Sequence, residues 1–167
     1  MNGPNLGDIG LVDIRGRVGT AIRVGQWMVG DGWSRYQHAF VYVGDGHVVE
    51  AMPQGARRAS LDQYVGRDVG WLRCPTQLGA AVAEAAIGFI GVPYSFVDYG
   101  AIALRRFRIP TPRLRAYVET SRRLICSQLC DRAAEIGGWK LFDDGRWHGY
   151  VTPGSLHSLY RAQQSAD

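Results

Sequence analysis

The chain has 167 residues, of which 46% are hydrophobic and 20% are charged, and this composition excludes a disordered polypeptide. No apolar run is long enough to span a bilayer, and the three unevenly spaced cysteines argue against a disulfide framework. We expect residues 1–167 to form a single domain with a sizeable core.

Predicted strands dominate the first part of the chain. Residues 9–14 have the apolar content of a short buried strand, whereas residues 17–29 place apolar side chains at roughly helical spacing. Residues 38–43 and 47–51 are rich in β-branched and aromatic side chains and flank the turn Gly44-Asp45-Gly46. This arrangement is a strong signal for a β-hairpin.

Short elements and then a helix are predicted after the hairpin. They are a loop at residues 53–58, a short helix at residues 60–64 with a Ser60 cap, and a strand at residues 70–74. Thr76 is expected to cap a helix that continues through Ile90 and is ended by Gly91 and Pro93.

The later part of the chain is predicted to be mostly helical. The helical candidates are residues 95–107, residues 126–136 and, as a single final turn, residues 155–160. Gly137-Gly138 ends the second of these helices, and turns are expected at residues 143–145 and 152–154. Strands early and helices late indicate an α+β domain with a small antiparallel sheet.

Cys126 is the first residue of a predicted helix, which is a favourable place for a nucleophilic thiol. The unpaired N–H groups and the positive dipole end of a helix N-terminus stabilise a thiolate. A nearby imidazole can take the thiol proton and keep it as imidazolium. Cys126 is therefore the candidate nucleophile of a cysteine hydrolase or acyl transferase.

His38 opens a predicted strand, which makes it the candidate base. Pairing about the hairpin turn brings Glu50 roughly opposite His38, to within about one residue of register. Cross-strand neighbours lie about 5 Å apart at Cβ, so a carboxylate–imidazole hydrogen bond is feasible. A slip of one residue would turn Glu50 to the opposite face, and Gln37 or a backbone carbonyl would then orient the imidazole.

Five segments of the chain occur in an order that is found in a known superfamily. They are Gln37-His38-Ala39-Phe40-Val41-Tyr42-Val43, Val48-Val49-Glu50-Ala51, Gly91-Val92-Pro93-Tyr94-Ser95-Phe96, Cys126-Ser127-Gln128-Leu129 and Thr152-Pro153-Gly154-Ser155-Leu156. Over residues 7–157 the chain resembles the circularly permuted branch of the NlpC-like, papain-like cysteine peptidases, which includes lecithin:retinol acyltransferase-like enzymes. Many members have glutamate where this chain has Gln128, a difference that matters little if the side chain is peripheral.

The resemblance implies a circularly permuted papain-like fold, in which a small antiparallel sheet or half-barrel packs against helices. It implies that Cys126 is the nucleophile, His38 the general base and Glu50 the orienting acid. It also places Tyr94 beside the active site. Tyr94 and Gln37 are the candidate substrate-binding residues.

The other thiols and imidazoles have simpler interpretations. Cys130, one helical turn after the candidate nucleophile, is expected in the core, and Cys74 is expected to be structural at the end of a strand. The alternative bases are His47, close to the hairpin turn, and His148 and His157, among turn residues near the C-terminus. No spacing typical of a zinc site occurs, and we expect no cofactor.

Basic residues concentrate in residues 105–123, which we expect to form a surface excursion. This segment contains Arg105, Arg106, Arg108, Arg113, Arg115, Arg122 and Arg123, with Glu119 as its one acid. It could contact phosphates, an anionic lipid or an anionic cell-wall polymer, although a solvated face is the simpler interpretation. The segment lacks the aromatic pattern of a stacking platform, so we expect no nucleic-acid partner.

We expect a thiol hydrolase that cleaves an amide bond, with a cell-wall (peptidoglycan) peptide as the preferred substrate class. The first alternative is an acyltransferase or a lipid amidase or esterase with the same triad, for which residues 102–107 would supply an apolar trough. The second is a catalytically inactive binding or particle-structural module. Because no secretory signal is evident, we expect a cytoplasmic protein, or one released by lysis or carried in a particle.

Overall fold

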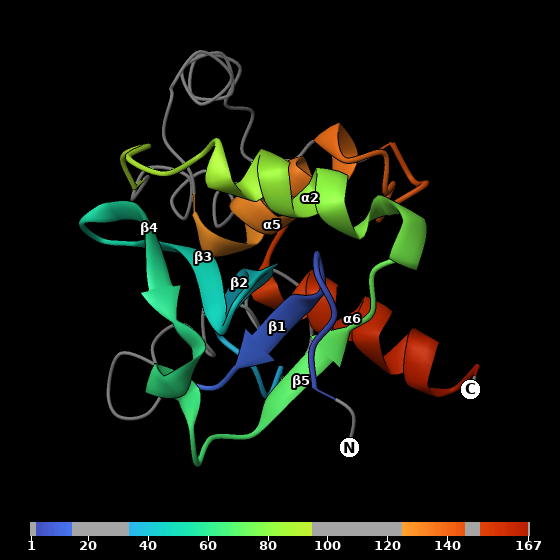
Figure 1. Ribbon diagram of the computed structural model, residues 1–167. Helices are drawn as coiled ribbons and strands as arrows, with labels where there is room; N and C mark the ends of the chain where they lie inside the picture. Colours follow the sequence, from blue (N-terminus) through green and yellow to red (C-terminus); the bar gives the residue numbers. More distant parts are fainter. Residues whose placement is uncertain (1–2, 15–33, 95–124, 146–150, 167) are drawn as a thin grey trace, which may run out of the picture.

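The computed structural model describes residues 3–14, 34–94, 125–145 and 151–166. In these ranges the chain forms an α+β fold with one five-stranded antiparallel sheet and three α-helices (Figure 1). The strands are β1 (Ile9–Val12), β2 (His38–Gly44), β3 (His47–Met52), β4 (Gly55–Ser60) and β5 (Val69–Leu72), in the spatial order β4-β3-β2-β1-β5. The helices are α2 (Gly79–Ile87), α5 (Cys126–Ile136) and α6 (Pro153–Gln164), with 3₁₀ turns η1 (Leu61–Tyr64) and η2 (Thr76–Leu78). The expected fold class is confirmed at this level.

The hairpin of β2 and β3 forms where the sequence predicted it. Asp45 and Gly46 have φ angles of 51° and 69°, the positive values that a tight hairpin turn of this type requires. The register differs from our expectation, because Glu50 lies opposite Phe40 and the ladder shifts between Tyr42 and Gly44. His38 is therefore a diagonal neighbour of Glu50. An offset of two residues keeps both side chains on the same face of the sheet.

The predicted loop at residues 53–58 is wrong, because this segment contributes to an edge strand, β4. Its backbone pairs with β3 on one side, and on the other side Ala56 exchanges hydrogen bonds of 2.8 Å with Gly91 and Val92. Exposed Arg57 and Arg58 gave this segment the polarity of a loop. Charged side chains are also common on edge strands, where they discourage pairing with other chains.

Three helix ends differ from the prediction, and one of them is the end of α2, which lies at Ile87 and not at Ile90. Thr76 does not cap α2: residues 76–78 form the turn η2, and the N-cap residue of α2 is Leu78, without a side-chain cap. The expected turn at residues 152–154 is instead the start of α6, which is twelve residues long. There the Thr152 hydroxyl accepts a hydrogen bond from the Ser155 N–H at 3.1 Å, and Pro153 takes the first helical position, where proline is favoured.

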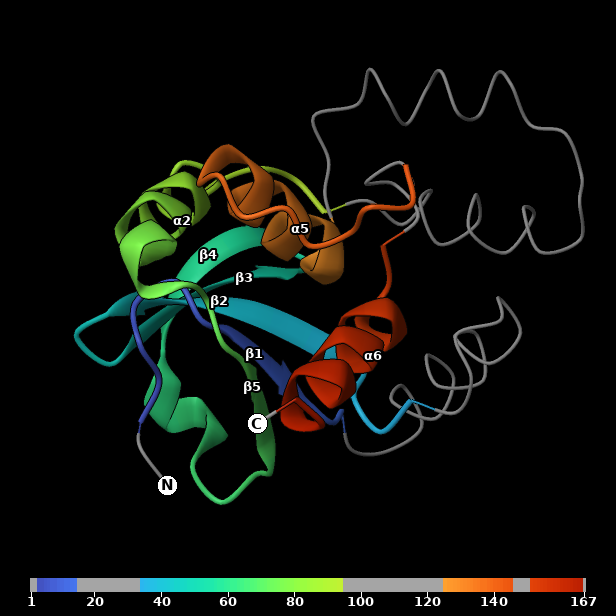
Figure 2. The ribbon, with the colours of Figure 1, turned by 90° about the vertical axis from the view of Figure 1, so that its right-hand side faces the viewer.

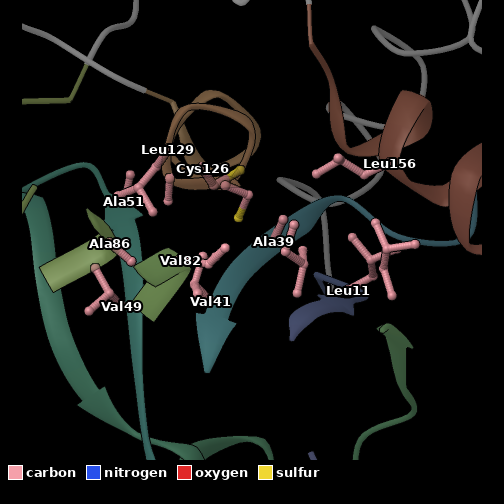
Figure 3. Packing of buried hydrophobic residues seen from close by; sticks show 14 of the residues in the cluster. Leu11, Ala39, Val41, Val49, Ala51, Val82, Ala86, Cys126, Leu129 and Leu156 are labelled. Carbon is pink, nitrogen blue, oxygen red and sulfur yellow. The ribbon is translucent and has the colours of Figure 1, made fainter. Parts of the chain in front are cut away.

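The helices cover one face of the sheet, and this layer holds the main core. Figure 2 shows α2 and α5 side by side over the sheet and α6 beside β1 and β5. Alternate residues of the strands point into this layer, as β-strand geometry requires. Figure 3 shows Leu11, Ala39, Val41, Val49 and Ala51 of the strands together with Val82, Ala86, Leu129 and Leu156 of the helices.

A smaller core covers the opposite face of the sheet, beneath η1. Here Phe40 stacks on Tyr64 with ring centroids 4.5 Å apart and an interplanar angle of 15°. Gly10 of β1 makes room for the Phe40 ring, because a Cβ atom at this position would overlap the ring. This second core places Tyr64 on the face that also carries His38 and Glu50.

We expect the substitution Gly10→Ala to lower the free energy of unfolding by about 1–3 kcal/mol, because the added methyl group displaces Phe40 from its stack. Chemical denaturation measures the loss. The double variant Gly10→Ala/Phe40→Leu should lose less than the sum of the single variants, since the smaller side chain relieves the overlap. Strictly additive losses would show that the overlap with Phe40 is not the cause.

The predicted helices at residues 17–29 and 95–107 lie outside the described residues, as do the arginine-rich segment 105–123 and His148. Within the described ranges, none of the helices combines the length and the apolar character of a membrane span.

Candidate active site

Cys126 is the first residue of α5, and its neighbours fix this helix end in place. The Gln128 side-chain oxygen accepts a hydrogen bond from the Ile125 N–H at 3.2 Å, which caps the helix. The Ser127 hydroxyl donates to the Val151 carbonyl at 2.7 Å and ties the first turn to the segment before α6. We expected the replacement of the family's glutamate by Gln128 to matter little if this side chain were peripheral. Gln128 is instead buried.

The Cys126 sulfur lies at the beginning of β2, where three hydrogen bonds converge on it. It bonds with the His38 side chain and accepts from the backbone N–H groups of Ala39 and Ser127. Figure 3 shows Cys126 on α5 close to Ala39 on β2. Burial of the thiol, which is 2% exposed, raises its pKa, but these bonds and the His38 charge outweigh burial and lower the pKa below its ordinary value.

His38 connects the sulfur to a carboxylate. Its Nε2 lies 2.8 Å from Glu50 Oε2, so Nδ1 is the ring nitrogen left to face Cys126. Burial lowers the pKa of this imidazole, but the hydrogen bonds and charges of Cys126 and Glu50 raise it to about 9. The cationic imidazolium is thus favoured, and it lies between two anions.

Glu50 is completely buried on β3, the second strand from one edge of the sheet, and accepts hydrogen bonds on both oxygens. Oε1 accepts from Arg57 Nε at 3.0 Å, from Arg57 Nη2 at 2.8 Å and from Gln63 Nε2 at 3.2 Å. Oε2 accepts from the Tyr64 hydroxyl as well as contacting His38. Burial alone would raise the pKa of Glu50, but the bonds to His38, Tyr64 and Arg57 lower it to about 2.

Our sequence reasoning missed Arg57, Gln63 and Tyr64 as partners of Glu50. Arg57 lies directly opposite Glu50 in the β3–β4 register, but this pairing is visible only once residues 55–60 are recognised as a strand. The short helix that carries Gln63 and Tyr64 was predicted, together with its Ser60 cap, which accepts from the Asp62 N–H at 3.1 Å. Its position over the sheet has no local signal in the sequence.

The two candidate substrate-binding residues have different surroundings. The Gln37 side chain is buried, accepts from the Ile14 N–H at 3.1 Å, and donates to the carbonyls of Ser34 and Arg35 at 3.1 and 2.8 Å. These bonds give Gln37 a scaffold role, which is to hold the segment that leads into His38. Tyr94 is half-buried and packs against the main core.

The remaining described thiols and imidazoles lie in other environments. Cys74 and Cys130 are buried free thiols, and burial raises the pKa of Cys74 to about 11 and that of Cys130 well above its ordinary value. His47 Nδ1 lies 2.7 Å from the Asp45 carbonyl at the hairpin turn. His157 is part of α6, and its Nδ1 lies 3.3 Å from the Ser34 hydroxyl. Among the described residues, His38 is the imidazole that is hydrogen-bonded to Glu50, and these four side chains have other partners.

The described part of the chain holds no cluster of three or more His, Cys, Asp or Glu side chains that could bind a metal ion. A scan against the models of known protein families finds no match for this chain, and a search of curated proteins finds no match either.

The site is a buried row of three side chains. The pKa of the Cys126 thiol is lowered, the pKa of the His38 imidazole is raised, and Glu50 is held as a carboxylate. A thiolate is the reactive form of cysteine, and an adjacent imidazolium can deliver a proton to a leaving group. The arrangement is suited to nucleophilic attack on a carbonyl carbon followed by acid-assisted departure of an amine or alcohol.

Proposed function

We propose that this protein is a thiol hydrolase of the circularly permuted, papain-like type, with Cys126 as nucleophile, His38 as general base and acid, and Glu50 as the group that orients the imidazole. The observation that carries the proposal is the continuous hydrogen-bonded row from the Cys126 sulfur through His38 to Glu50. Its support from the sequence is the order of the five segments, in which the histidine and the acid precede the cysteine.

The first half of the proposed reaction forms a thioester. The Cys126 thiolate attacks the carbonyl carbon of an amide, and a C–S bond forms while the carbonyl oxygen becomes an oxyanion. The backbone N–H of Cys126, at the N-terminus of α5, is a candidate donor to that oxyanion. As the C–N bond breaks, the His38 imidazolium gives its proton to the departing amine, which leaves an acyl-enzyme and a neutral imidazole.

The second half restores the starting state. Neutral His38 takes a proton from a water molecule, and the resulting hydroxide attacks the thioester carbonyl. The C–S bond breaks, the acid product leaves, and Cys126 and His38 return to thiolate and imidazolium. Glu50 stays ionised throughout, because the Arg57 guanidinium, the Tyr64 hydroxyl and His38 all stabilise its carboxylate.

For the substrate we propose a peptide amide of the bacterial cell wall, on the strength of the resemblance to NlpC-like peptidases. Incubation with purified peptidoglycan should release peptide fragments with new amino groups. Release from peptidoglycan without turnover of acyl esters supports this class. Turnover of long-chain acyl esters with no peptide release would favour a lipid-directed enzyme with the same triad.

The ionised thiol can be tested without a known substrate. We expect iodoacetamide to modify Cys126 at pH 5.5, where an ordinary thiol is only about 0.1% ionised. The rate should fall less between pH 8 and pH 5.5 than the rate of an ordinary thiol, because the hydrogen bonds and charge of His38 lower the pKa of Cys126. Mass spectrometry of the cysteine peptides measures the rate at each site.

Cys74 and Cys130 serve as internal controls, since burial raises the pKa of each. The variant His38→Ala should slow the modification of Cys126 at pH 5.5 by at least about tenfold, because its thiol then keeps its proton. Equal, slow modification of all three cysteines would contradict the proposed function and support an inactive binding module.

A further inference from the structure

We propose that Arg57 is a positioning residue of this acid–base system, whose guanidinium supplies the charge that allows Cys126, His38 and Glu50 to be ionised together. The inference deepens the proposed function and rests on it. Arg57 lies on the far side of Glu50 from His38 and touches neither the sulfur nor the imidazole in any hydrogen bond that we observe among the described residues.

Arg57 holds one oxygen of the Glu50 carboxylate with two hydrogen bonds. It lies directly opposite Glu50 in the β3–β4 ladder, and its Nε and Nη2 both donate to the same carboxylate oxygen, Oε1. Oε2 is thereby left to His38 and Tyr64. Because the guanidinium is rigid and planar, its two bonds hold Oε1 in place, and the bonds of Oε2 to His38 and Tyr64 then set the orientation of the carboxylate.

The second part of the argument concerns charge. Thiolate, imidazolium and carboxylate together carry one net negative charge, and the three side chains that hold it are nearly or fully buried. Uncompensated charge in a protein interior is strongly disfavoured. Addition of Arg57 makes the row neutral overall, with signs that alternate from Cys126 to His38 to Glu50 to Arg57.

Arg57 also connects this buried row to water. Its side chain is 49% exposed, whereas that of Glu50 is fully buried. The guanidinium therefore keeps part of its hydration while it neutralises the carboxylate, which reduces the cost of burying a charge.

Other charged and titratable groups near the row do not replace Arg57. On the Glu50 side, Gln63 and Tyr64 are uncharged donors, and Arg67 lies over the Tyr64 ring at 5.7 Å from its centroid. On the Cys126 side, the nearby groups of α5 are Cys130 and Asp131. Neither can offset a negative charge. Loss of Arg57 should thus cause the row to bind one more proton near neutral pH.

The test is the pH profile of Cys126 modification by iodoacetamide in the full-length chain. In Arg57→Gln we expect the rate at pH 5.5 to fall about tenfold and to recover near pH 8, which is a shift of the ionisation midpoint to higher pH. Arg57→Lys keeps the charge and should stay within about threefold of the wild-type rate. Arg58→Gln, the exposed neighbour on β4, is the matched control and should have no effect.

Tyr64→Phe separates charge from hydrogen bonding, because it removes a neutral donor to the same carboxylate. We expect a smaller shift of the ionisation midpoint than in Arg57→Gln, because the tyrosine hydroxyl carries no net charge. An unshifted profile in Arg57→Gln, or an equal shift in Tyr64→Phe, would overturn the role of the Arg57 charge. If Arg57→Gln does not fold, a shift of Arg57→Lys by more than one pH unit would overturn it instead.

These results separate the two proposals. A wild-type profile without any His38-dependent reactivity at pH 5.5 would refute the proposed function itself. A reactive wild type whose profile does not change in Arg57→Gln would refute only the role of Arg57. A structural role alone would lower the melting temperature of Arg57→Gln without moving its midpoint.

Discussion

The variant Cys126→Ala should release peptide fragments from purified peptidoglycan at least about a thousandfold more slowly than the wild-type protein. The proposed acyl-enzyme cannot form without the sulfur, and loss of a nucleophile from a catalytic triad typically costs this much or more. Cys126→Ser should be nearly as slow, because a serine hydroxyl has far too high a pKa to be ionised by the imidazolium pairing seen here. Rates of fragment release, measured by quantitative mass spectrometry, provide the comparison.

The other cysteines provide matched controls for this experiment. Cys74→Ser and Cys130→Ala alter buried thiols whose pKa values are raised, and we expect each to keep activity within a few fold of wild type if it folds. The same variants should be assayed with acyl esters in parallel. Undiminished activity of Cys126→Ala on every substrate that the wild type cleaves would exclude the proposed nucleophile.

The second large effect concerns stability: Glu50→Ala should lower the free energy of unfolding at pH 7 by about 3 kcal/mol. Removal of one partner from a buried ion pair leaves the other charge uncompensated, which typically costs 3–5 kcal/mol. We expect the lower end of that range, because His38 can become neutral and Arg57 is half-exposed to solvent. Glu84→Ala, which removes an exposed carboxylate from α2, should change stability by no more than about 0.5 kcal/mol.

The stability that Glu50 contributes should depend on pH in a defined direction. Its pKa is about 2 in the folded protein, compared with an ordinary value of 4.5, so the unfolded chain binds the proton more readily. The contribution is therefore complete above pH 4.5 and is lost as the pH falls from there toward 2. The difference in unfolding free energy between wild type and Glu50→Ala should shrink over this interval. A difference that grows with acidity would show that Glu50 is not held as a carboxylate.

Local signals account for the elements that the sequence predicted well. The β2–β3 hairpin follows from a turn that needs positive φ angles, flanked by β-branched residues, and the structure places strands at His38–Gly44 and His47–Met52. The helix at Cys126–Ile136 was predicted with its exact bounds, because Gly137 and Gly138 end it. These signals depend only on neighbouring residues, so the chain reveals them without knowledge of its fold.

Features that depend on residues far apart in the sequence were missed or predicted at the wrong position. The β4 strand was predicted as a loop, since an edge strand with paired arginines has the composition of a loop. The register of Glu50 was two residues from our expectation, because pairing centred on Asp45 places Glu50 opposite Phe40 rather than His38. The cap of η1 was predicted, whereas its position over Phe40 and Glu50 was not.

The amino-acid order by itself determined which residues could perform the chemistry: a thiol at the start of a helix, an imidazole at the start of a strand, and a carboxylate across a hairpin. Only the tertiary structure decided that these three side chains share one buried row and that Arg57 and Tyr64 complete it. The physical reason is that hydrogen bonding within a few residues is encoded locally. Burial and charge compensation instead depend on which segments the folded sheet brings together.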